Sequence, residues 1–159
     1  MLFDLVAPAI ASVAAACDIF WRRIPNWLTF SAFLAGLSVH AVMGGASGLL
    51  VALGGAALGL CLLLPFYVIH AMGAGDVKLL TALGALLGPH ALVSVAIYTA
   101  LAGGAIALVL LARQGRLQLS LGDVMTRPLS LRRGGAKAPY GVAIACGVYL
   151  AMLLPSVIG

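Results

Sequence analysis

The sequence predicts an all-α, polytopic membrane protein with about six transmembrane helices and both termini on the external side of the membrane. The first observation is composition, since hydrophobic residues make up 64% of the 159 residues and charged residues only 8%. Soluble domains carry about 25% charged residues, so this chain has too little polar surface to cover itself in water. The second observation is the spacing of its apolar runs, and the third is the placement of its basic residues.

Six apolar runs have lengths near those of membrane-spanning helices, which need about 20 residues. They cover residues 2–19, 27–43, 48–69, 77–88, 91–112 and 139–158. The fourth run is the shortest, and Gly88-Pro89-His90 separates it from the fifth. Proline inside a helix removes a backbone hydrogen bond and clashes with the preceding turn. We therefore predict a break at this point, and two spans rather than one long helix.

The nine Lys and Arg residues fall in three places. Arg22 and Arg23 follow the first span, Lys78 opens the fourth, and the others lie within residues 113–137. With six spans, these three places share one side of the membrane, and the opposite side has no basic side chain. Cytoplasmic loops are enriched in Lys and Arg, so the basic side is expected to be cytoplasmic. The net charge of +5 is thus a topology signal, and no aromatic and basic stripe indicates binding to nucleic acid.

Residues 1–159 are expected to form a single membrane-embedded domain, because the composition does not change along the chain. The one long polar loop covers about residues 113–137. Two interpretations of this loop remain open: a partly ordered flap that faces the substrate, or a solvated loop near anionic lipid headgroups.

Cysteine and glycine residues bear on the packing of the predicted helices. The three cysteines are far apart and each lies in an apolar run, which favours buried thiols over a zinc site or a disulfide framework. They are Cys17, Cys61 and Cys146. Gly55-x-x-x-Gly59 and Gly84-x-x-x-Gly88 have the spacing for close contact between helices, either within the chain or between copies of it. The oligomeric state therefore stays open.

All acidic residues of the chain are aspartates: Asp4, Asp18, Asp76 and Asp123. Asp4 lies on the predicted external side, and Asp123 lies in the long loop. Asp18 ends the first span and Asp76 opens the fourth, so both lie at the predicted cytoplasmic boundary. A carboxylate at the edge of the membrane core is costly and indicates a functional site.

Two carboxylates close together can perform acid–base chemistry that neither performs alone, because like charges favour a pair that shares one proton. The ionised member takes a proton from attacking water, and the protonated member polarises a peptide carbonyl. The pattern predicts an intramembrane aspartyl protease with Asp18 and Asp76 as its catalytic pair. Two alternatives remain open. In the first, each aspartate extends to the membrane interface or forms an ion pair with Arg22, Arg23 or Lys78. In the second, the two form a proton or cation site in a small transporter subunit.

The segments around the aspartates predict the shape of the site. Two glycines precede the second aspartate in Gly73-Ala74-Gly75-Asp76, and they let a substrate strand approach the carboxylate closely. The run Arg22-Arg23-Ile24-Pro25-Asn26 is typical of a cytoplasmic turn that enters a new helix. Lys78 either favours the charged form of the neighbouring carboxylate or anchors the fourth span at the headgroups. The expected substrate-binding or site-shaping residues are Gly73, Gly75, Lys78, Arg22, Arg23, Pro25 and Asn26.

Three of these segments together resemble a known family. Gly73–Asp76 matches the GxGD signature, and Gly73–Leu80 with Gly84 and Gly88 resembles the type IV prepilin peptidases. Asp18 followed by Arg-Arg-Ile-Pro-Asn is similar to that family's first catalytic segment. Ala138-Pro139-Tyr140-Gly141 is similar to its entry into the last span. The GxGD signature alone is a weak indication, but the ordered set is a strong one.

The resemblance implies a metal-independent aspartic endopeptidase that needs no cofactor. It would remove the leader peptide from pilin precursors at the cytoplasmic face of the bacterial inner membrane. By motif match, Asp18 and Asp76 would be its catalytic residues. The implied substrate has a short basic leader, a small residue at the cleavage point, and then an apolar helix embedded in the bilayer.

The chain differs from the long form of this family, because it lacks a cytoplasmic segment with paired CxxC motifs between its first spans. Zinc is therefore not expected, and the resemblance leaves N-methylation of the new pilin terminus undecided. The chain is more similar to the short peptidases that serve Flp-type (tight adherence) pili.

Overall fold

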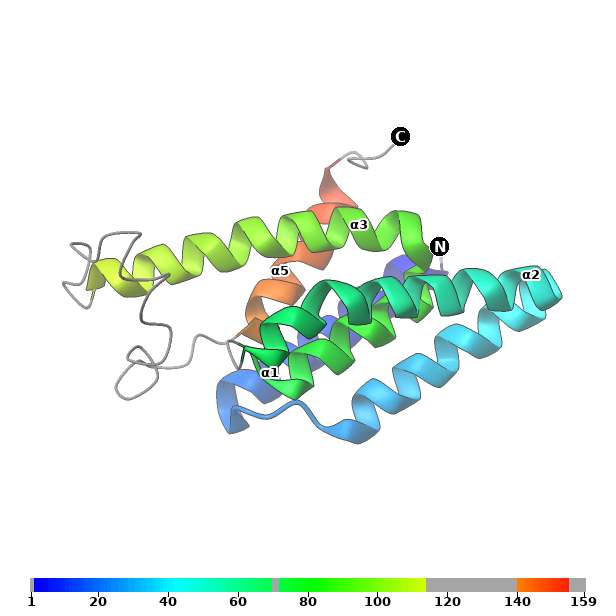
Figure 1. Cartoon of the computed structure of the whole chain (residues 1–159), viewed down its shortest axis with the longest axis horizontal. Helices are drawn as coiled ribbons and strands as arrows, with labels where there is room; N and C mark the ends of the chain where they lie inside the picture. The colour runs from blue at the N-terminus through cyan, green and yellow to red at the C-terminus, as the bar shows by residue number, and fades with distance from the viewer. Residues whose placement is uncertain (1, 70–71, 114–139, 155–159) are drawn as a thin grey trace.

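A computed structural model describes residues 2–69, 72–113 and 140–154, and these residues form helices only (Figure 1). The helices are α1 (Leu2–Trp21), α2 (Asn26–Val68), α3 (Ala74–Arg113) and α5 (Tyr140–Leu153). The predicted all-α class is therefore confirmed for the described residues. The predicted polar loop, apart from its first residue, lies outside them.

The two longest helices each reverse direction at a glycine. Gly45 in α2 has a φ of 57° and Gly88 in α3 has a φ of 78°, both in the left-handed region that glycine enters without steric cost. In Figure 1, α2 runs out and returns along itself, and α3 does the same. The predicted break at Gly88-Pro89-His90 is confirmed, and it is the glycine backbone that turns. The described residues thus form six helical stretches.

Glycines bring the backbones of α2 and α3 into direct contact. A Cβ atom placed on Gly36 would lie 2.7 Å from the carbonyl carbon of Ala85. One on Gly59 would lie 2.6 Å from the carbonyl oxygen of Leu80, and Gly55 and Gly84 meet each other in the same way. Small residues at a helix interface permit this approach and the dispersion contacts that it brings. The two glycine spacings seen in the sequence therefore serve packing within the chain.

Helix α5 packs against both α1 and α3. Its contact with α1 includes a hydrogen bond between the hydroxyls of Ser12 and Tyr149, which lie 2.8 Å apart. Alanines of α1 face inward at this packing, and leucines of α3 fill the centre of the bundle. The largest fully buried side chains are Leu79, Leu80, Leu83, Leu86, Leu92, Ile144 and Val148. This core packs together α1, which ends beside the predicted site, and α3, which begins beside it.

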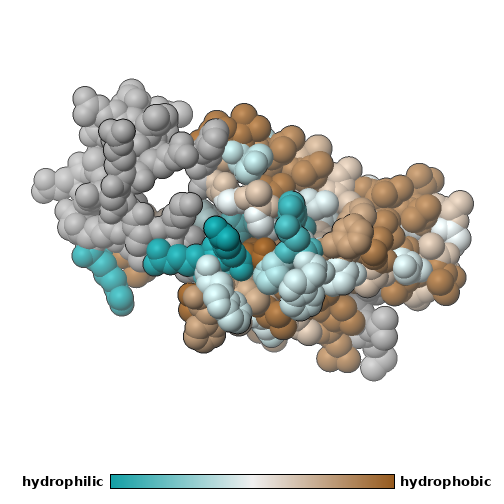
Figure 2. Space-filling model, turned by 90° about the horizontal axis from the view of Figure 1, so that it is seen from below, coloured by the Kyte–Doolittle hydropathy of each residue, from teal (hydrophilic) through white to brown (hydrophobic). Residues whose placement is uncertain are grey.

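The outer surface of the bundle is largely apolar, as expected for a protein surrounded by lipid. Phe20 is 77% exposed and Val42 is 87% exposed, with many large apolar side chains like them. Helix α2, and α3 as far as Val109, are long and apolar enough to cross a membrane, and α1 and α5 are shorter apolar helices. Figure 2 shows hydrophilic residues gathered toward one end of the face in view, with mostly apolar residues over the other end.

One packing prediction is partly wrong. Cys17 is buried as predicted, but Cys61 and Cys146 are exposed on the outside of the bundle. Lipid rather than the protein interior surrounds such positions, so an apolar run in the sequence does not identify the face that packs against another helix.

The glycine contact between α2 and α3 predicts opposite effects at two neighbouring positions. Gly55→Ala places a Cβ 2.8 Å from the carbonyl carbon of Gly84, whereas Gly54→Ala meets no atom within 4 Å. Both substitutions gain the same helix propensity, so their difference isolates the contact. We expect Gly55→Ala to be less stable than Gly54→Ala by about 1–3 kcal/mol, the usual cost of overpacking. Thermal unfolding in detergent checks this, and equal midpoints would contradict the described interface.

Candidate active site

The ends of four helices gather at one end of the bundle. Helix α1 ends there, α2 and α3 begin there, and α5 starts beside the last turn of α1 (Figure 1). The reversals at Gly45 and Gly88 lie toward the opposite end (Figure 1). Helix ends carry unpaired backbone N–H and C=O groups, so this end concentrates polar backbone in an otherwise apolar molecule.

Asp18 lies in the last turn of α1 and is half-buried. Its side-chain oxygen Oδ2 accepts a hydrogen bond of 2.8 Å from the backbone N–H of Gly141, at the start of α5. Its backbone carbonyl accepts a bond of 3.0 Å from the N–H of Arg22. Arg22 has a φ of 50°, a left-handed conformation that ends the helix after Trp21, within one turn of Asp18. Asp18 is therefore held at both its side chain and its backbone.

Asp76 lies in the first turn of α3 and is 8% exposed. Its Oδ2 accepts a hydrogen bond of 3.2 Å from the backbone N–H of Gly73, three residues earlier. A Cβ atom on Gly73 would lie 3.2 Å from the same oxygen, which is tighter than ordinary contact. Glycine at position 73 therefore lets the segment before α3 fold back onto the carboxylate.

The carboxylates of Asp18 and Asp76 lie close enough for a direct electrostatic interaction. They come from different helices and from positions 58 residues apart in the chain. Two like charges in a poorly hydrated place are unfavourable, which favours a pair that holds one proton between its members. The structure thus brings together the two aspartates singled out by the sequence.

The start of α2 forms a hydrogen bond with the start of α3. Pro25 precedes the first turn of α2, and its carbonyl accepts a bond of 3.2 Å from the N–H of Leu28. Asn26 accepts a hydrogen bond of 2.9 Å from the ammonium group of Lys78 through its side-chain oxygen Oδ1. Lys78 therefore contacts α2, and no ion pair links it to Asp76 within the described residues.

Arg22 and Arg23 are exposed, and neither forms an ion pair with Asp18 in the part of the chain that the structure describes. The alternative in which each aspartate is neutralised by a neighbouring basic side chain is thus not supported by the geometry. The exposed guanidinium groups remain available to lipid headgroups or to substrate.

Residues 5–108 of the chain match the model of the type IV leader peptidase family. The chain belongs to this family. Its members are aspartic proteases that cleave the leader peptides of prepilins. The matched residues include Asp18, Asp76 and all the helix ends around them except the start of α5. No curated protein and no solved structure matches the chain.

Two residues that contact the candidate site were not assigned a role there from the sequence. Ile24 packs on Gly75, where an added Cβ would lie 3.2 Å from the Cβ of Ile24. Gly141 was noted only as part of a resemblance, although it donates the hydrogen bond to Asp18. In the sequence, Ile24 is marked as an apolar residue within a basic turn. Gly141 is marked as a glycine at the entry to the last helix.

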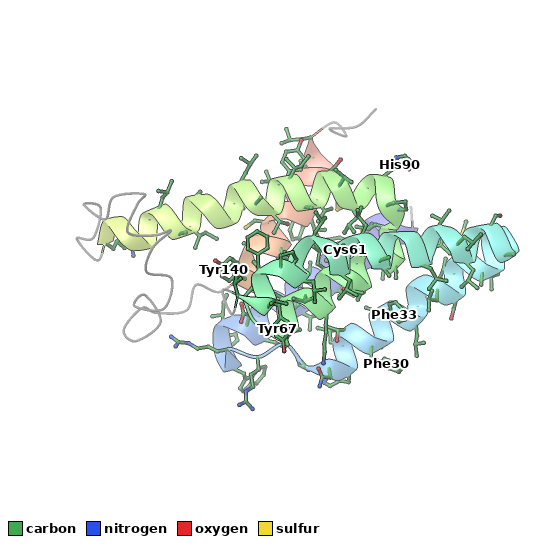
Figure 3. The ribbon with its side chains drawn as sticks, viewed as in Figure 1. Phe30, Phe33, Cys61, Tyr67, His90 and Tyr140 are labelled. Carbon is green, nitrogen blue, oxygen red and sulfur yellow. The ribbon has the colours of Figure 1, made fainter. Side chains whose placement is uncertain are left out.

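One of the described histidines lies away from the candidate site. His90 lies beside the reversal of α3, far from Tyr67 and Tyr140 near the helix ends (Figure 3). Among the described residues, no group of three or more His, Cys, Asp or Glu side chains could hold a metal ion.

The contact between Ile24 and Gly75 predicts a disulfide cross-link. Cβ atoms of bonded cysteines lie about 3.5–4.5 Å apart, a distance that a small shift allows here. In a background with Cys17, Cys61 and Cys146 replaced by Ala, we expect Ile24→Cys with Gly75→Cys to form a disulfide under mild oxidation in membranes. The matched control pairs Ile24→Cys with Gly54→Cys, because Gly54 has no neighbour within 4 Å. Mass spectrometry of the linked peptides distinguishes the pairs, and equal cross-linking of both would contradict the contact.

Proposed function

We propose that Asp18 and Asp76 are the catalytic pair of a leader peptidase that processes Flp-type prepilins at the cytoplasmic face of the bacterial inner membrane. The observation that carries the proposal is the placement of both aspartates at the same end of an apolar helix bundle, where backbone N–H groups of Gly141 and Gly73 hold their carboxylates. Membership of the type IV leader peptidase family supplies the reaction, which is cleavage of a prepilin leader.

The pair performs the two proton transfers that peptide hydrolysis needs. The ionised aspartate takes a proton from water as the water oxygen bonds to the scissile carbonyl carbon. The protonated aspartate donates a hydrogen bond to the carbonyl oxygen, where negative charge develops. A proton then passes from the pair to the leaving nitrogen as the carbon–nitrogen bond breaks. The backbone N–H groups of Gly141 and Gly73 hold the two carboxylates during these steps.

The direction of the chain in the membrane follows from its charges. The basic side chains Arg22, Arg23 and Lys78 are exposed and lie in the segments that border the aspartates. Cytoplasmic segments carry an excess of such residues, so this end of the bundle faces the cytoplasm. Six helical stretches then cross the membrane as one domain, with both termini external.

The proposed substrate matches this placement. A prepilin whose apolar helix lies in the bilayer presents its leader junction at the cytoplasmic boundary, beside the helix ends that hold Asp18 and Asp76. Assignment to Flp-type prepilins rests on the absence of the CxxC-bearing segment from the connection between the first two helical stretches, residues 22–25. The transporter alternative has no specific observation in its favour.

Replacement of either aspartate tests the proposal. We expect Asp18→Asn and Asp76→Asn each to lower the rate of leader removal by at least about 10²-fold, because each deletes a general acid–base group. The double variant is expected to lose little more, since the two residues act as one unit. The measurement is conversion of a co-expressed Flp-type prepilin to mature pilin, followed by immunoblotting.

Asp123→Asn is the matched control, because it removes the same charge from the predicted cytoplasmic loop. It is expected to process the prepilin at the wild-type rate. Continued processing by Asp18→Asn and Asp76→Asn at that rate would refute the assigned pair. Processing of a type IV prepilin of another class, with the Flp-type substrate left uncut, would refute the substrate assignment alone.

A further inference from the structure

We propose that Gly141 is a positioning residue for Asp18, and that the N-terminus of α5 sets the placement of this carboxylate in the proposed catalytic pair. The inference rests on the proposed function, since it assumes that Asp18 takes part in catalysis. It extends the site beyond residues 5–108, the part of the chain that matches the family model.

The first observation is the hydrogen bond itself. Gly141 is the second residue of α5, and its N–H lies 2.8 Å from Oδ2 of Asp18. The first N–H groups of a helix have no partner within the helix and point along its axis. A carboxylate is a favoured partner there, because the helix dipole places partial positive charge at this end. A carboxylate has two oxygens, so a bond to Oδ2 fixes the group while Oδ1 remains able to accept a proton.

The second observation is that only glycine fits at position 141. A Cβ atom there would lie 2.9 Å from both the Cβ and the Oδ2 of Asp18, and 3.2 Å from its Cγ. Real Cβ atoms essentially never approach other atoms within 3.0 Å. Gly141 is helical and is not among the positive-φ glycines, which are Gly45 and Gly88. Close approach to Asp18, rather than backbone conformation, is therefore what excludes a side chain.

The third observation is that α5 is itself packed against α3, on the helical stretch that follows the reversal at Gly88. Near the site, a Cβ on Gly103 of α3 would lie 3.5 Å from the Cβ of Ala143. One turn further along α5, a Cβ on Gly147 would lie 2.7 Å from the backbone nitrogen of Thr99. Helix α5 is therefore fixed against α3 along this face while its N-terminus holds the Asp18 carboxylate.

The test compares two glycines of the same helix. Gly141→Ala is expected to displace the Asp18 carboxylate and to lower kcat by about 10²-fold, since misplacement by about 1 Å has this effect. KM should stay within about twofold, because substrate binding does not use this contact. Gly147→Ala disturbs packing against Thr99 without touching Asp18, so it should lower thermal stability and leave kcat within about twofold of wild type. Gly104→Ala, with no atom within 4 Å, is the neutral control.

A backbone variant separates the hydrogen bond from the steric clash. Replacement of Gly141 by glycolic acid, through nonsense suppression in cell-free translation with lipid nanodiscs, removes the N–H donor and adds no Cβ. We expect this ester variant also to lose kcat, by at least about tenfold, with KM little changed. It keeps the proposal testable if Gly141→Ala does not fold.

The outcomes separate the two proposals. If Asp18→Asn abolishes cleavage while both Gly141 variants keep the wild-type kcat, the positioning role is refuted and the catalytic pair stands. Equal loss of kcat in Gly141→Ala and Gly147→Ala, in proportion to their loss of stability, would also refute it. If Asp18→Asn cleaves at the wild-type rate, the proposed function itself is refuted.

Discussion

Two carboxylates at the same end of an apolar helix bundle interact unfavourably when both are charged, and the surrounding backbone stabilises each of them. Asp18 and Asp76 interact electrostatically, and each accepts a backbone hydrogen bond, from Gly141 and from Gly73. Backbone N–H groups stabilise carboxylates without adding a basic side chain that would neutralise the pair. The proposed catalytic pair therefore consists of two acidic groups without a basic partner among the described residues, as the proposed aspartic peptidase chemistry requires.

Close glycine packing between helices limits how far α3, which carries Asp76, can move. Contact between the backbones of α2 and α3 at Gly55 and Gly84 leaves little room for α3 to slide. Ile24, in the connection from α1 to α2, packs on Gly75 in the first turn of α3. Since Asp76 lies in that turn, contacts at the interior of the bundle and at its polar end act on the same carboxylate.

Much of this was predictable because lipid imposes simple rules on sequence. Apolar runs predicted the helices, and glycine and proline predicted the reversal at Gly88. The scarcity of acidic residues indicates Asp18 and Asp76 from the sequence alone. These predictions depend on composition and on order along the chain, which the sequence contains directly.

Contacts between helices could not be predicted in the same way. Cys61 and Cys146 are exposed although their segments are apolar, because lipid and protein interior favour the same side chains. Gly141 lies 123 residues from Asp18 in the chain, and no pattern within either segment indicates their hydrogen bond. The packing of Ile24 on Gly75 likewise depends on how the helices are arranged.

The central claim is that the two aspartate positions lie together in the resting enzyme. The direct measurement is bridging of Asp18→Cys and Asp76→Cys by a short bifunctional thiol reagent, in membranes without substrate. Cys17, Cys61 and Cys146 are replaced by Ala in this variant. The account predicts that mass spectrometry finds one reagent molecule bridging α1 and α3. Two separately labelled thiols with no bridged product would contradict it.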